Sequence, residues 1–168
     1  MSTGYRPEKR TVTVRVLTDG GWLTGAISTP PNRSLAESLA QAPTLLSMAD
    51  VWLPGQDFNL PFFALRARSV HLILLENGEE IQEVSGTIVR AAPQEVVVLV
   101  ENSIVSGIAM VPQNLRVSDY FSRQRGFVRL TRATLRMPEP GGRQAVLRQC
   151  PEILVNAERM VGVAENSA

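Results

Sequence analysis

The stretch from Thr11 to Thr29, TVTVRVLTDGGWLTGAIST, contains the pattern that decides the fold. Its first seven residues alternate polar and apolar side chains, as in a strand with one buried face. Asp19–Gly21 then supplies a turn, and a second strand is expected over Trp22–Thr29. The stretch therefore predicts a β-hairpin and, with it, a mainly β protein.

The same pattern returns 82 positions later, in QEVVVLVENSIVSGIAMVP from Gln94 to Pro112. A shift of 82 positions superposes residues 12–53 on residues 94–135 without a gap. The identical pairs fall at expected turns and inside expected strands, which predicts a tandem repeat. They are Val14/Val96, Val16/Val98, Leu17/Leu99, Gly25/Gly107, Pro30/Pro112, Asn32/Asn114 and Leu53/Leu135.

Each copy continues beyond the hairpin in the same way. A short helix is predicted over Ser34–Gln41, because Ser34 and Glu37 have capping-box spacing while Leu35 and Leu39 share a helical face. Further strands are expected over 45–53, 60–65 and 70–74. The sequence thus predicts two barrel-like β-β-α-β-β-β units.

The expected domain organisation follows from the repeat. After residue 53 the shift grows to 90, because the second copy has eight extra residues, which belong in a hairpin loop. Units of this size are near the lower limit for an adequate core, so we expect them to pack together. The expected parts are a tail at 1–10, a first repeat at 11–80, a second at 81–165 with a longer hairpin at 136–148, a bridging strand at 84–91 and a tail at 166–168.

The first copy resembles Sm-like small barrels at two places. One is the run of alternating apolar residues, an Asp-Gly turn, and then an apolar residue and a glycine. The other is an apolar strand that ends in Arg and a small residue before a β-branched strand. The residues involved are Val14, Val16, Leu17, Asp19, Gly20, Leu23 and Gly25 for the first motif, and Phe63, Leu65, Arg66, Ala67, Val70 and Leu72 for the second.

This resemblance implies RNA binding through loops and ring formation through exposed edge strands. The chain departs from the family pattern in the helix between its second and third strands, and in Ala67 where the family has glycine. The second copy has Asn156 and Ala157 at the Arg-Gly positions. Separately, Arg116–Asp119 is similar to an Arg-apolar-Ser-Asp segment of a β-rich bacterial family.

Composition excludes several classes of protein. The chain is 44% hydrophobic with a net charge of +1, so it is not intrinsically disordered. Cys150 is the only cysteine, which excludes an intramolecular disulfide and fits a reducing compartment, so a cytoplasmic location is expected. No apolar stretch approaches the roughly 20 residues of a membrane-spanning helix. Residues 1–10 are polar and do not resemble a secretory signal.

No catalytic or metal site is predicted. His71 is the only histidine, so a histidine-centred site lacks partners, and a structural role is expected for it. Cys150 has no activating base nearby in sequence. Neither a phosphate-binding loop nor a dinucleotide fingerprint is present, so no cofactor is expected. The chain is therefore interpreted as a non-enzymatic protein.

The strongest local signal is a basic segment in the second copy. From residue 116 to residue 136, six arginines stand against one acidic residue, Asp119, which gives a local charge of +5. Guanidinium groups bind phosphate and carboxylate, so the segment is a candidate site for an acidic partner, RNA or a nucleotide. A solvated outer face is the alternative. The arginines are Arg116, Arg123, Arg125, Arg129, Arg132 and Arg136.

Aromatic residues are concentrated in the first copy and form a candidate apolar interface. They do not interleave with the arginines as stacking platforms for bases would. The leading hypothesis is a protein assembly or adaptor module that binds itself or other proteins through edge strands. The alternative is an RNA- or nucleotide-binding module. The candidate interface residues are Trp52, Phe58, Phe62 and Phe63.

Overall fold

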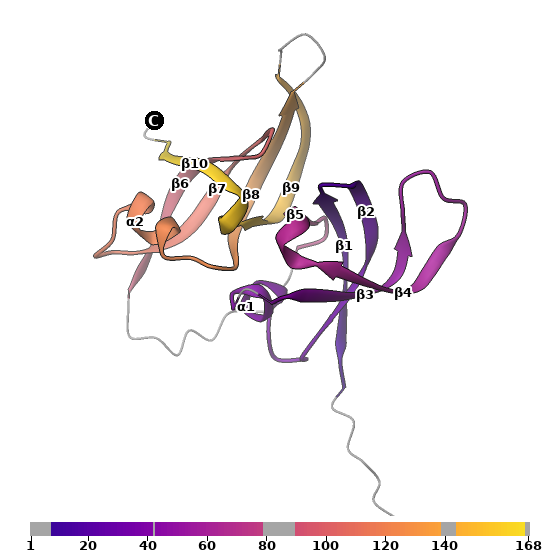
Figure 1. Ribbon diagram of the computed structural model, residues 1–168. Coiled ribbons are helices and arrows are strands. Elements are labelled where there is room, and N and C mark those ends of the chain that lie inside the picture. Colours follow the sequence, from indigo (N-terminus) through magenta and orange to yellow (C-terminus); the bar gives the residue numbers. More distant parts are fainter. Residues whose placement is uncertain (1–7, 42, 79–89, 139–143, 167–168) are drawn as a thin grey trace, which may run out of the picture.

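The computed structural model describes residues 8–41, 43–78, 90–138 and 144–166, and Figure 1 shows their arrangement. The described residues form ten β-strands, two short α-helices and two 3-10 turns. The mainly β prediction is confirmed. In chain order the elements are β1 (Arg10–Thr18), β2 (Gly21–Thr29), α1 (Leu35–Leu39), β3 (Leu45–Trp52), β4 (Asn59–Arg66), η1 (Ala67–Ser69), β5 (Val70–Leu75), β6 (Ala91–Val100), β7 (Ser103–Pro112), α2 (Val117–Ser122), β8 (Phe127–Pro138), β9 (Gln144–Asn156), η2 (Ala157–Arg159) and β10 (Met160–Glu165).

The strands form one open antiparallel sheet rather than two closed barrels. Their order is β10-β6-β7-β8-β9-β5-β1-β2-β3-β4, so β4 and β10 are the free edges among the described strands. The barrel-like expectation is wrong because neither half closes on itself. Instead β5 of the first half pairs with β9 of the second, which merges both halves into a single sheet (Figure 1).

The two halves place their elements at corresponding positions. We call residues counterparts when they are related by the shift of 82 up to residue 53, or by the shift of 90 from residue 61 onward. By this definition α1 and α2 begin at counterpart residues. The same holds for η1 and η2 and for β5 and β10. Asp50 and its counterpart Arg132 share a positive φ, 52° and 47°, beside irregularities in β3 and β8.

The counterpart glycines Gly25 and Gly107 lie where neighbouring strands approach closely. A Cβ on Gly25 would lie 3.0 Å from Val51 Cγ2 and 3.1 Å from Ala49 O. A Cβ on Gly107 would lie 3.0 Å from Thr131 O. These distances are shorter than ordinary van der Waals contacts, so any larger residue would push the strands apart.

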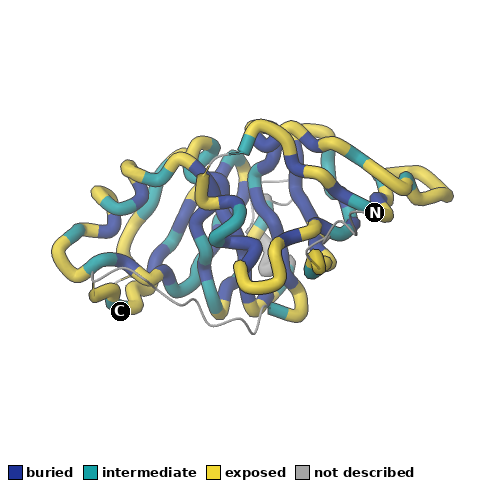
Figure 2. The backbone as a smooth tube through the Cα atoms, turned by 90° about the horizontal axis from the view of Figure 1, so that it is seen from below, coloured by how far each residue is buried: buried dark blue, intermediate teal, exposed yellow. Residues whose placement is uncertain are grey.

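Two hydrophobic cores lie on opposite sides of the central strands. In β5, Ile73 packs into the core of the first half, whereas Leu72 and Leu74 pack into the core of the second. Leu154 of β9 in turn belongs to the first core and its neighbour Ile153 to the second. Because successive side chains of a strand point to opposite faces, β5 and β9 are covered on both. Figure 2 shows buried residues concentrated in the middle of the sheet and exposed ones toward its ends.

The two helices begin differently. α1 has the predicted capping box, in which Glu37 N donates to Ser34 Oγ at 3.1 Å and Ser34 N donates to Glu37 Oε2 at 3.3 Å. α2 has Arg116 at its N-cap, with no side-chain hydrogen bond to the helix. Neither helix in the described part of the chain combines the length and apolar character needed for a membrane crossing.

Several expectations concern residues outside the described ranges. Most of the expected bridging strand at 84–91 lies there, as do both ends of the chain, 1–7 and 167–168. The long hairpin expected at 136–148 is described on both of its sides, where β8 and β9 pair as far as Pro138 opposite Gln144. Its tip lies outside the described residues.

Candidate functional site

The two free edges of the sheet carry a charged residue only at their ends, Arg66 in β4 and Glu165 in β10. β4 has no charged residue from Leu60 to Leu65, and β10 has none from Met160 to Ala164. The side chain of Phe62 is 65% exposed on β4. Charged side chains, prolines and bulges usually protect the edge strands of natural proteins. Pro61 and a register shift between Met160 and Gly162 interrupt only one end of each edge, so the remaining uncharged stretches are candidates for pairing with another chain.

The predicted apolar interface lies beside the β4 edge. Trp52 ends β3, Phe58 precedes β4, and Phe62 lies on β4, and all three are exposed. Phe63 is half-buried and packs against the core of the first half. The structure therefore places three of the four predicted residues on the surface of one hairpin, where they widen the apolar edge.

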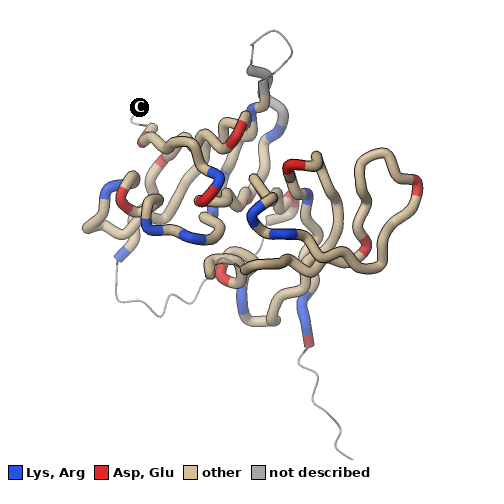
Figure 3. The backbone as a smooth tube through the Cα atoms, viewed as in Figure 1, with Lys and Arg blue, Asp and Glu red and all other residues tan. Residues whose placement is uncertain are grey.

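The six predicted arginines do not form a single patch. Arg116 and Arg123 flank α2 at its two caps, Arg125 lies in the loop before β8, and the remaining three lie on β8. Arg129 forms an ion pair with Glu152, at 2.9 Å between Nε and Oε1. Figure 3 shows the basic residues spread over several elements of both halves. Their role in binding stays a prediction.

The partner of Arg129 is a buried carboxylate. Glu152 is 1% exposed and lies in β9, opposite Leu75 of β5 and Thr131 of β8. Its counterpart in the first half is Phe62 on the free edge. The joint between the halves therefore contains a charged pair, whereas the corresponding position at the free edge is aromatic and exposed.

A second cluster of charged groups connects the hairpin turns of the two halves. Arg159 Nη2 lies 2.5 Å from Asp19 Oδ1 and 2.7 Å from Glu101 Oε1. Asp19 and Glu101 are counterparts, so one guanidinium bridges equivalent turns. His71 Nε2 lies 2.7 Å from the same Asp19 oxygen. The hydrogen bond from His71 is the main reason that the pKa of Asp19 is lowered, and Arg159 contributes to it.

The same cluster contains the ligand atoms of a candidate cation site. Single ligand atoms of Asp19, His71 and Glu101 lie within 4.8 Å of one another. However, the guanidinium of Arg159 contacts both carboxylates and lies 3.2 Å from His71 Nε2. Arg159 thus supplies the positive charge that balances the carboxylates of Asp19 and Glu101, in the place that a bound cation would take.

Cys150 is placed as a structural residue. Its side chain is 4% exposed, and its thiol contacts the main-chain oxygens of Glu152 at 3.2 Å and Leu75 at 3.4 Å. Burial raises the pKa of this thiol, which keeps it protonated at neutral pH. A protonated and covered thiol is a poor nucleophile.

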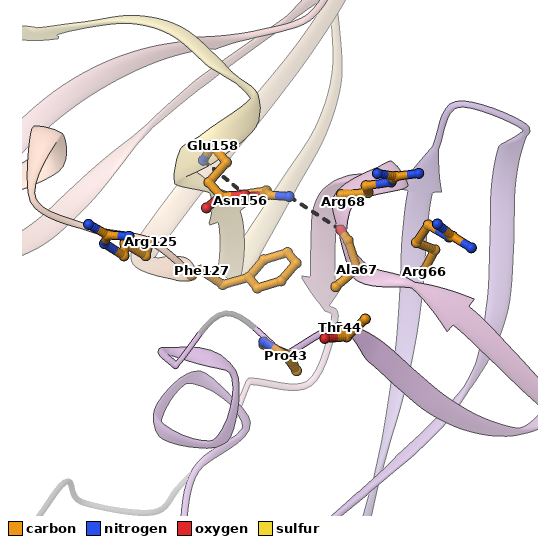
Figure 4. Close-up of a pocket in the computed structure, with 10 residues that line it drawn as sticks. Pro43, Thr44, Arg66, Ala67, Arg68, Arg125, Phe127, Asn156 and Glu158 are labelled. Atoms are coloured by element: carbon orange, nitrogen blue, oxygen red, sulfur yellow. Dashed lines mark hydrogen bonds between the residues drawn. The ribbon is translucent and has the colours of Figure 1, made fainter.

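A pocket of about 200 Å³ lies between the halves. Figure 4 shows Arg66 and Arg68 on one side, Arg125 on the other and Phe127 between them. Of these three arginines only Arg125 belongs to the predicted basic segment at 116–136, since Arg66 and Arg68 lie in the first half of the chain. No local pattern indicates that residues from both halves line one pocket.

Comparison of the chain with protein-family models, with curated proteins and with solved structures finds no match.

Proposed function

We propose that this chain is a non-enzymatic assembly module whose copies join through the free edges of their sheets. The main support is the pairing of β5 with β9 within the chain, because the counterparts of these two strands are the free edges of the sheet. β4 is the counterpart of β9, and β10 is the counterpart of β5. A second copy can therefore place β10 against β4 as β5 lies against β9.

The internal joint also specifies the register of the proposed contact. Within the chain, Leu72 lies opposite Val155 and Leu75 lies opposite Glu152. Transferred to the counterparts, Gly162 of one copy lies opposite Leu65 of the next, followed by Val163 opposite Ala64, Ala164 opposite Phe63, and Glu165 opposite Phe62. Pro61, which lacks an N–H group, falls just outside this paired stretch.

This arrangement joins two different surfaces of each copy. A head-to-tail contact repeats, so it produces a closed ring or an open fibre depending on the rotation between copies. Main-chain hydrogen bonds supply pairing, and the exposed aromatic residues beside β4 supply apolar area to bury. Among the described residues, Phe62 gains most from burial because it is the most exposed aromatic side chain.

A tandem duplication would account for this geometry, and we propose it as the origin of the two halves. Its support is the coincidence of helix starts, 3-10 turns and final strands under the same shifts that align the sequences. The shared glycines and the paired positive φ values at Asp50 and Arg132 point the same way. A single repeat that paired with its own copies would have become covalently linked by such a duplication.

Engineered disulfides test the register. In a Cys150→Ala background, we expect Ala64→Cys with Val163→Cys, or Phe63→Cys with Ala164→Cys, to form intermolecular disulfides on mild oxidation. Adjacent opposing pairs alternate in Cα separation, so at least one pair should have suitable geometry. The readout is a ladder of covalent oligomers on a non-reducing gel.

The matched control is Leu60→Cys with Val163→Cys, four residues out of register and therefore displaced by about 13 Å. An equally strong ladder from this control would contradict the proposed register.

Light scattering tests assembly itself. We expect the wild-type mass to exceed that of one chain and to rise with protein concentration. Ala64→Lys should shift the mass toward the monomer, because a lysine on an edge strand opposes pairing. Thr13→Lys, on an exposed position of the internal strand β1, should leave the mass unchanged. A wild-type protein that remains monomeric at every concentration would contradict the proposal.

RNA or nucleotide binding is the second candidate function. It is favoured by the exposure of Arg116, Arg123, Arg125, Arg132 and Arg136, which have no hydrogen bond or ion pair with another described side chain. Titration with RNA over a salt series tests it, because phosphate contacts give an affinity that falls steeply with salt. Absence of binding at low salt would exclude this function.

A further inference from the structure

The pocket between the halves has walls that tertiary hydrogen bonds hold in place. Ala67 N donates to Thr44 O, and the counterpart Ala157 N donates to Gly126 O, both at 3.0 Å. Asn156 is 4% exposed, and its Nδ2 donates to Ala67 O at 3.3 Å, which ties the two sides together. The pocket is therefore preformed rather than a gap between mobile loops.

The charges around this pocket are not balanced. Its lining contains Arg66, Arg68 and Arg125 and one acidic residue, Glu158. Within the described residues, the three guanidiniums form no hydrogen bond or ion pair, and all three side chains are exposed. Arg129 and Arg159, by contrast, each contact a carboxylate. The pocket thus brings together three guanidinium groups that no described residue pairs with, against the single carboxylate of Glu158.

We propose that this pocket binds the phosphate group of a small phosphorylated molecule. Arginines from both sides can donate several hydrogen bonds to the oxygens of one tetrahedral phosphate. A planar carboxylate has only two acceptor oxygens and would use fewer of these donors. Figure 4 shows Arg125 on one side of the buried ring of Phe127 and Arg66 and Arg68 on the other, with their guanidinium groups directed outward. These exposed side chains would turn inward to hold a ligand above this apolar floor. The inference is independent of assembly through the sheet edges.

The size of the pocket limits the ligand. Sites for drug-sized molecules measure about 300–1,000 Å³, whereas this pocket measures about 200 Å³. One phosphate with a short attached group is an appropriate occupant. Glu158 on the rim disfavours a second phosphate nearby.

Calorimetric titration at constant ionic strength tests the proposal, with inorganic phosphate, glycerol 3-phosphate and acetate as probes. We expect both phosphate probes to bind and acetate to bind more weakly. Arg125→Glu and Arg68→Glu should each weaken phosphate binding by at least about tenfold. Arg116→Glu is the matched control, because Arg116 is exposed at the N-cap of α2 and does not line the pocket.

Circular dichroism shows whether each variant remains folded, and Arg125→Gln and Arg68→Gln give second variants without charge reversal. Phosphate binding that is absent, that acetate matches, or that Arg116→Glu reduces equally would overturn the proposal. It would also be overturned if a short RNA oligonucleotide bound at this pocket and inorganic phosphate did not compete with it.

Discussion

Asn156 of the second half donates a hydrogen bond from Nδ2 to the main-chain oxygen of Val70 in the first half, at 2.8 Å. The side chain is buried, and its Oδ1 accepts a hydrogen bond from Glu158 N at 3.1 Å. The side-chain amide of Asn156 thus hydrogen-bonds the end of β9 to the start of β5. The joint between the halves is therefore held by side-chain contacts in addition to strand pairing.

Replacement of this amide should weaken the joint. Asn156→Ala leaves the oxygens of Ala67 and Val70 without these donors, at a cost of about 1–3 kcal/mol in the free energy of unfolding. Asn156→Asp should cost more, because a carboxylate cannot donate to either oxygen. Chemical denaturation measures both variants. An Asn156→Asp protein as stable as wild type would contradict this role.

The ion pair between Arg129 and Glu152 should be costly to break from one side. Arg129→Met removes the cation beside a buried carboxylate, which typically costs about 3–5 kcal/mol. The double variant Arg129→Met/Glu152→Leu removes both charges and should recover much of that loss. Denaturant unfolding of the two single variants and the double variant measures the coupling. A double variant whose loss equals the sum of the single losses would indicate no coupling.

Gly126 should tolerate no side chain. A Cβ at this position would lie 2.4 Å from Leu39 O and 2.6 Å from Ala40 O, at the end of α1. Both obstructing atoms belong to the main chain, so Gly126→Ala must displace α1 from β8, and we expect a loss of at least about 1–3 kcal/mol. Gly20→Ala is the matched control, because a Cβ at Gly20 would make only an ordinary contact, 3.6 Å from Thr18 Oγ1. Thermal unfolding should separate the two variants clearly, and equal stabilities would contradict the steric argument.

Cys150 should be unreactive in the folded protein. Burial raises the pKa of its thiol above the ordinary value of 9.0. Its stabilising contribution is therefore present below pH 9.0 and decreases as the pH rises through the folded-state pKa. At neutral pH a thiol reagent should label Cys150 only on unfolding, and added denaturant should accelerate labelling. Rapid labelling without denaturant would show that the thiol is accessible.

Asp19 should contribute to acid sensitivity. Its pKa is lowered from 3.8, mainly by the hydrogen bond from His71, so the contribution is present above pH 3.8. It is lost as the pH falls through the lowered value, because protonation of the carboxylate weakens its contacts with His71 and Arg159. The stability difference between wild type and Asp19→Asn should thus shrink below pH 3.8. Unfolding measured over a pH series checks this, and a constant difference would contradict it.

Local patterns predicted the secondary structure closely. The polar–apolar alternation in Thr11–Leu17 predicted β1, and the spacing of Ser34 and Glu37 predicted the start of α1. The turn expected at Asp19–Gly21 is also present, at Asp19 and Gly20, whereas Gly21 already begins β2 and pairs with Thr18. These features depend on interactions between residues near each other in the chain.

The candidate surfaces were predicted less completely. The aromatic residues around Phe62 were grouped because aromatic residues are concentrated in the first half, and their exposure, which Phe63 does not share, is known only from the structure. The pocket residues Arg66 and Arg68 were not grouped with Arg125, since these positions are about sixty residues apart in sequence. The bridge from Arg159 to Asp19 spans an even greater separation and was not predicted.

The sequence by itself determined the strands, the turns and the order of elements in each half, because alternation, capping and glycine act over a few residues. Only the tertiary structure decided that β5 pairs with β9 rather than closing a barrel. A free strand can pair with any edge of suitable direction and register, so main-chain hydrogen bonds alone do not select a partner. That selection depends on the packing of Ile73 and Leu154 into one core and of Leu72 and Ile153 into the other, which exists only after the halves meet.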